Sequence, residues 1–96
     1  MIPKSMDSLE LVEMIMLVEE IFGTDIPDHD AEDFSSPREM VDWLEPRLSN
    51  QRPNKQAVTL LTRLAKVHGR PELAQNLSGT WRREQIAAIV REIFRE

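Results

Sequence analysis

The architecture of this chain follows from one segment, Asp7-Ser8-Leu9-Glu10-Leu11-Val12-Glu13-Met14-Ile15-Met16-Leu17-Val18-Glu19-Glu20-Ile21-Phe22. Its apolar residues recur at intervals of three and four, which predicts an amphipathic helix over residues 8–22. Gly23 follows directly and suits the left-handed residue that often ends a helix. Ser8 therefore stands at the start of a four-turn helix with acidic residues along it.

Two apolar surfaces share this helix. At about 100° per residue, one broad face is expected to enter the core; it comprises Leu11, Met14, Ile15, Val18, Ile21 and Phe22. A second group, here called the outer strip, consists of Leu9, Val12 and Met16 and lies beside Glu10, Glu13 and Glu20. The outer strip either docks a partner that has an apolar groove and basic edges, or packs under the second half of the chain. The sequence leaves both interpretations open, and both could hold at different times.

The rest of the chain is also predicted to be helical. Residues 30–34 form a short turn, and Ser36-Pro37-Arg38-Glu39 is a strong start for a helix over 37–48. Further helices are expected over 55–68, 71–77 and 81–95, the last with Thr80 as its cap. We expect an all-α fold with a boundary near residue 50, dividing a region 1–50 from a helical extension 51–96.

Composition narrows the class of protein. The 96 residues contain no cysteine, which excludes disulfides and thiolate zinc sites, and they show no signal peptide and no apolar run long enough for a membrane span. We expect a cytoplasmic protein. Residues 1–50 hold thirteen acids and three bases, and residues 51–96 hold nine bases and four acids. The acidic half favours basic protein partners over nucleic acid, and the basic half is able to pair with it.

Several motifs in residues 5–48 resemble acyl carrier proteins. Asp7-Ser8-Leu9 with the acidic helix resembles the second helix of that family, and the likeness continues through Asp25-Ile26-Pro27-Asp28 and Asp30-Ala31-Glu32-Asp33-Phe34. It ends with Ser35-Ser36-Pro37 and Met40-Val41-Asp42-Trp43-Leu44. The resemblance implies a helical bundle that is not itself an enzyme and carries acyl groups as thioesters. It leaves the cargo open among fatty acid, polyketide, amino acid and sugar-linked chemistry.

The resemblance also implies roles for individual residues. Ser8 would carry 4′-phosphopantetheine, which a separate phosphopantetheinyl transferase draws from coenzyme A. Asp7, beside the serine, and the acids Glu10, Glu13 and Glu20 would meet basic docking surfaces of acyl-processing enzymes, and Leu9, Val12 and Met16 would touch those partners. The position of Ser8 is consistent with this attachment, because free amides at a helix start favour a phosphodiester. Two alternatives are that Ser8 is only a helix cap, and that the chain is an unmodified interaction module.

The chain departs from the family before the serine. Acyl carrier proteins place a full helix there, but only seven residues precede Ser8, and Ser5 stands where glycine is usual. The apolar rhythm of Glu84-Gln85-Ile86-Ala87-Ala88-Ile89-Val90-Arg91-Glu92-Ile93-Phe94 resembles that first helix. We therefore expect residues 81–95 to supply it, within one chain or by a swap that forms a dimer. The alternative is that 55–96 form a separate module and the true start of the protein is missing.

Other signals are weaker. His29 and His68 lie far apart, and the acids of residues 28–33 lack the spacing of a calcium loop, so no metal site is expected. Trp81-Arg82-Arg83 is the best argument for a nucleic-acid regulator, but the bases are spread and the chain is acidic overall. We rank that function a distant third and expect no nucleic-acid partner.

Overall fold

The first helix is built as its periodicity predicts. A computed structural model describes residues 8–34 and 36–94, with side chains from residue 10 onward. Helix α1 spans Ser8–Phe22, and Gly23 ends it with a φ of 65°. The amide of Gly23 donates to the carbonyl of Glu19 at 2.8 Å. A residue with a Cβ would be strained at this φ, so glycine is what lets the chain turn here.

Two helices follow α1. Helix α2 spans Asp28–Asp33, two residues earlier than the predicted turn at 30–34, because the carbonyl of Pro27 accepts hydrogen bonds from the amides of Asp30 and Ala31. Helix α3 spans Pro37–Leu48, as predicted, and the hydroxyl of Ser36 accepts from the amide of Glu39 at 3.4 Å. Pro46 lies inside the last turn of α3, and the helix still continues to Leu48.

Helix α4 spans Lys55–His68, also as predicted. Asn54 is its cap, accepting from the amide of Ala57 at 2.7 Å, and Gly69 ends it in the left-handed conformation. The predicted helix over 71–77 is too long. Only Pro71–Ala74 coils, as the 3₁₀ helix η1, and Gln75 then takes an extended conformation.

The last helix, α5, spans Arg83–Ile93, shorter at both ends than the predicted 81–95. Thr80 does not cap it; the cap position belongs to Arg82, whose amide donates to the side chain of Gln85 at 3.0 Å. Trp81 precedes the helix because its amide donates to the carbonyl of Gln51 and its buried ring meets the ring of Phe22 edge-on, with centroids 4.7 Å apart. Burial of this indole holds the chain extended where the sequence predicted a helix start.

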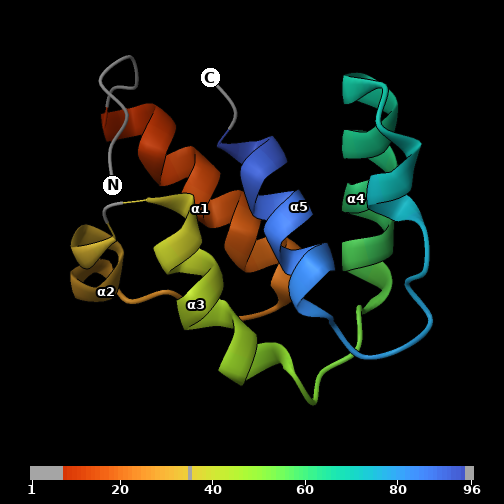
Figure 1. Ribbon diagram of the computed structural model, residues 1–96. Coiled ribbons are helices and arrows are strands. Elements are labelled where there is room, and N and C mark those ends of the chain that lie inside the picture. The colour runs from red at the N-terminus through yellow and green to blue at the C-terminus, as the bar shows by residue number, and fades with distance from the viewer. Residues whose placement is uncertain (1–7, 35, 95–96) are drawn as a thin grey trace.

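The four longer helices share one hydrophobic core. Helix α5 packs along α3 and also contacts α1, while α4 packs against α1 and η1. Figure 1 shows α3 and α5 side by side and running in opposite directions, with α4 standing at one end of the molecule. The core draws on both halves of the chain; its fully buried side chains include Val18, Ile21, Met40, Leu44, Leu48, Leu61, Ile86, Ile89 and Val90. The prediction of an all-α helical bundle is confirmed.

Charged side chains join α5 to α3. The guanidinium of Arg83 contacts Asp42 at 2.6 Å and Glu45 at 2.7 Å. These hydrogen bonds raise the pKa of Arg83. This base of the second half thus pairs with acids of α3.

None of the helices within residues 8–34 and 36–94 combines the length and apolar character that a membrane crossing needs.

Candidate functional site

The proposed attachment point lies at the N-terminus of α1. The helix begins at Ser8, and Glu10 is the acidic residue of its first turn. Asp7 lies outside the described residues, as do the side chains of Ser8 and Leu9. What the structure describes is therefore the helix that starts at this serine and the surface that follows it.

The outer strip is open to solvent along its described length. The side chains of Val12 and Met16 are 52% and 51% exposed. Glu10, Glu13 and Glu20 are also exposed. The second half of the chain does not cover Val12 and Met16, so of the two interpretations of these residues, packing under residues 51–96 is wrong. An apolar strip with carboxylates on its border is left on the surface.

Glu19 belongs to the end of α1 and not to the open surface. Its carboxylate accepts a hydrogen bond from the amide of Ile26 at 2.7 Å. Ile26 is buried, and this bond holds the loop before α2 against the end of α1. Glu19 therefore has a structural role, unlike the exposed acids Glu10, Glu13 and Glu20.

Helix α4 covers a different side of α1. Leu17 is partly buried against the core, although the helical wheel of α1 alone did not place it on the core face. Between α1, α4 and α5 lies a cavity of about 280 Å³. Its lining comprises Glu10, Glu13, Met14, Leu17, Leu64, His68 and Ile93. The sequence did not predict this cavity, since it exists only through the placement of α4 beside α1.

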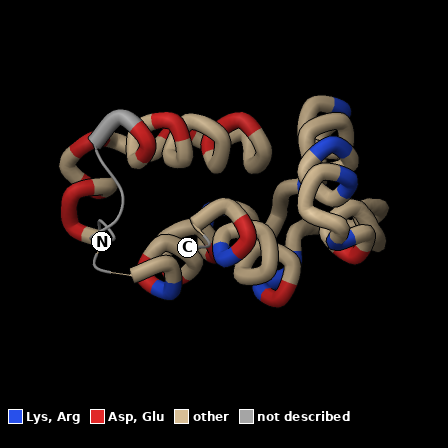
Figure 2. Tube along the Cα trace, turned by 90° about the horizontal axis from the view of Figure 1, so that it is seen from above, with Lys and Arg blue, Asp and Glu red and all other residues tan. Residues whose placement is uncertain are grey.

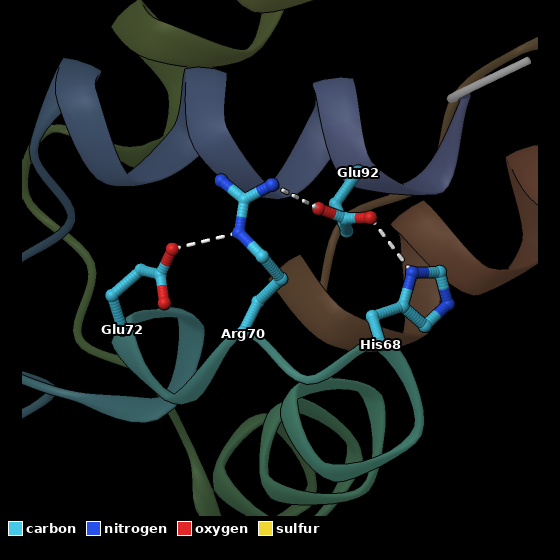
Figure 3. Close-up of polar contacts among 4 residues, drawn as sticks. All are labelled: His68, Arg70, Glu72 and Glu92. Carbon is cyan, nitrogen blue, oxygen red and sulfur yellow. Dashed lines mark hydrogen bonds and ion pairs between the residues drawn. The ribbon is translucent and has the colours of Figure 1, made fainter.

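A polar network fastens α4 and η1 to α5 (Figure 3). Glu92 is buried, with 3% of its side chain exposed, and its carboxylate contacts His68 Nδ1 at 2.7 Å and Arg70 at 3.1 Å. Arg70 also holds Glu72 at 2.7 Å, which raises the pKa of Arg70 and lowers that of Glu72. This network was missed from sequence, where Glu92 reads as an ordinary charged residue of an amphipathic helix. His29, the other histidine, is exposed on α2 beside Asp30.

The charges are distributed unevenly over the fold. Figure 2 shows acidic residues along α1 and α2 and basic residues on α4, while acidic and basic residues are mixed on the side formed by α3 and α5. The acidic residues of α1 and α2 and the basic residues of α4, which are separated along the sequence, are thus also separated in the fold. The face that carries Val12 and Met16 is acidic.

Comparison with known proteins shows what the segment that contains α1 is similar to. The family described as "Phosphopantetheine attachment site" matches residues 5–44. The segment is similar to acyl carrier proteins. An acyl carrier protein of Rubrobacter xylanophilus (strain DSM 9941 / JCM 11954 / NBRC 16129 / PRD-1) is 53% identical over 38 residues, which are 40% of this chain and 47% of that protein. The matched segment spans about half the length of that relative. No solved structure matches the chain significantly.

The prosthetic group of this family is 4′-phosphopantetheine, held covalently, and the fold suits it. Helix α1 starts within the matched segment, so its first amides and the positive end of its dipole favour the phosphodiester of the arm. When bound, the group supplies a flexible tether that ends in a thiol. Within the described residues no cluster of three histidine, aspartate or glutamate side chains is arranged to hold a metal ion.

Proposed function

We propose that the chain is a non-enzymatic acyl carrier protein. Ser8 holds the 4′-phosphopantetheine arm, and the thiol of the arm carries acyl or related groups as thioesters to partner enzymes. The observation that carries this proposal is the start of α1 at Ser8 inside a phosphopantetheine attachment segment. Partners with basic surfaces suit the acids Asp7, Glu10, Glu13 and Glu20, and an apolar patch among their bases suits Leu9, Val12 and Met16. A cytoplasmic location remains part of this proposal.

The proposal includes the completion of the bundle by residues from the C-terminal half. Residues 5–44 match the family, but the helix that packs along α3 and contacts α1 is α5, from far outside that segment. We propose that α5 takes the place of the first helix that carriers normally have, within one chain. This assignment joins regions 1–50 and 51–96 into one folding unit.

Modification of Ser8 is tested by mass. Co-expression with a broad-specificity phosphopantetheinyl transferase is expected to add one arm to the chain, because Ser8 begins α1 within the segment that matches the phosphopantetheine attachment family. Intact-mass spectrometry measures the addition. Ser8→Ala should remove it completely, and Ser78→Ala, a change at an exposed serine elsewhere, should leave it unchanged.

Two results would contradict the carrier assignment. Ser8→Ala could gain the same mass as the wild type, which would move the attachment to another residue. Alternatively, the wild type could stay at its unmodified mass with every transferase tried. That second result would favour the other candidate function, an unmodified interaction module that uses the same exposed Val12 and Met16.

A further inference from the structure

A second surface of the molecule lies between α3 and α5 and belongs to neither the attachment point nor the outer strip. It is a groove of about 250 Å³, whose lining comprises Pro37, Arg38, Val41, Arg83, Ala87 and Arg91. Three of these six residues are arginines, and the other three are apolar. The volume is slightly below the ~300 Å³ at which small-molecule pockets begin, so any ligand is small.

The antiparallel packing of the two helices decides which arginines meet. Arg83 lies at the start of α5 and contacts Asp42 and Glu45 in the second half of α3. Arg91 lies eight residues further along α5, about 12 Å at 1.5 Å per residue. Because α3 runs the opposite way (Figure 1), Arg91 comes to the end of the groove where α3 begins, and Arg38 is in the first turn of α3.

The two ends of the groove differ in charge balance. The charge of Arg83 is offset by two carboxylates. Arg38 and Arg91 are exposed, and their side chains make no hydrogen bond or ion pair with another residue in the ranges 8–34 and 36–94. The positive end of the dipole of α3 lies at the same place. The side chains of Arg38 and Arg91 therefore line the same end of the groove, beside the start of α3, and neither forms an ion pair with another described residue.

We propose that this end of the groove binds a small phosphorylated ligand, with Arg38 and Arg91 as its two anchors. A guanidinium offers paired donors in a fixed plane, and two guanidinium groups that approach from different helices suit a tetrahedral anion with several acceptor oxygens. A planar carboxylate is satisfied by one such fork. The apolar side chains of Pro37, Val41 and Ala87 then face the organic part of the ligand. This site does not depend on the modification of Ser8.

Titration with inorganic phosphate tests the proposal on the full chain carrying Ser8→Ala, which separates it from the carrier function. Amide and arginine side-chain NMR resonances of Arg38, Val41, Ala87 and Arg91 should shift and saturate, while sodium chloride at equal ionic strength should not reproduce the shifts. Acetate should bind at least fivefold more weakly than phosphate.

Charge-removing variants locate the site. Arg38→Gln and Arg91→Gln should each weaken phosphate binding at least fivefold. Arg63→Gln, which removes an exposed base from α4, should leave the affinity within twofold. Thermal unfolding of each variant shows whether the fold is intact. The proposal is overturned by shifts that never saturate, by equal shifts with chloride, or by an Arg63→Gln effect as large as that of Arg38→Gln.

Discussion

Glu92 is the residue whose surroundings differ most from what its type suggests. A carboxylate that is 3% exposed is stable in a core only when it is paired, and its bonds to His68 and Arg70 meet that need. The same bonds tie α5 to the end of α4 and to the chain before η1. Glu92 therefore contributes to the attachment of the C-terminal half.

Replacing Glu92 by glutamine should destabilise the protein. The change keeps the size of the side chain but removes the charge that accepts from His68 and Arg70, and hydrogen bonds to charged groups contribute about 1.5–3 kcal/mol each. We expect a loss of about 1–3 kcal/mol in the free energy of unfolding, measured by urea denaturation at pH 7. Glu84→Gln, at an exposed position of the same helix, is the matched control and should change stability little. Equal effects of the two variants would show that the network does not stabilise the fold.

The Arg70–Glu72 contact should contribute to acid sensitivity. The hydrogen bond from Arg70 lowers the pKa of Glu72 below its ordinary value of 4.5. A lowered pKa in the folded state stabilises the protein above the unfolded value, and this stabilisation is lost as the pH falls through the folded value.

The variant Glu72→Gln should therefore be slightly less stable than the wild type at pH 7 and equal to it at a pH well below 4.5. Both partners are exposed, so the difference is small. Melting temperatures of the two proteins from pH 7 down to pH 3 measure it. A gap that persists or widens at low pH would rule out this pair as its source.

Among the helices, α1 has one side that enters the core, one side under α4 and one side in solvent. Val12 and Met16 are on the open side, about half exposed, between acids. A partner that buries these side chains would lose affinity if one of them became charged, since the charge would have to be desolvated in an apolar contact.

Val12→Glu should thus slow arm transfer by a phosphopantetheinyl transferase about tenfold in kcat/KM, equivalent to about 1.4 kcal/mol. The same substitution at Val67, which is 74% exposed on α4, is the matched control and should have little effect. Rates are measured from the appearance of the modified mass. If the two variants react equally fast, α1 does not dock the transferase through this strip.

Local signals predicted most helices, and distant contacts explain the exceptions. The bounds of α1, α3 and α4 could be read from periodicity and from Ser36, Gly23 and Gly69, because each signal acts within a few residues. The helix start predicted at Thr80 is absent because Trp81 packs against Phe22, which lies 59 residues earlier in the sequence. The same limit applies to the candidate site. The exposed acids of α1 were predictable, whereas the cavity beside Leu17 and the burial of Glu92 depend on where α4 lies.

For the molecule as a whole, the main question is whether residues 1–50 fold without the rest. The core combines Val18 and Met40 from the first half with Leu61, Ile89 and Val90 from the second. Removal of α5 would expose the inner faces of α1 and α3 together.

A chain truncated after Ser78 should not fold cooperatively. The lost helix contains four fully or nearly fully buried aliphatic side chains, and each contributes about 1.5–3 kcal/mol of burial, a sum comparable with the total stability of a small domain. Circular dichroism and urea denaturation of residues 1–78, compared with the full chain, measure the loss. A truncated chain that unfolds in one sharp transition as a monomer would show that residues 81–95 are a separate addition.

The position of α5 beside α1 and α3 also affects how the protein is made. A ribosome adds α5 after α1, α2, α3 and α4, and we expect the core around Val18 and Met40 to close only once α5 has emerged. Growing chains therefore leave the exit tunnel with an open apolar face, and products that stop early keep it, which makes them suitable substrates for chaperones and proteases. Only a chain translated through Ile93 can bury that face.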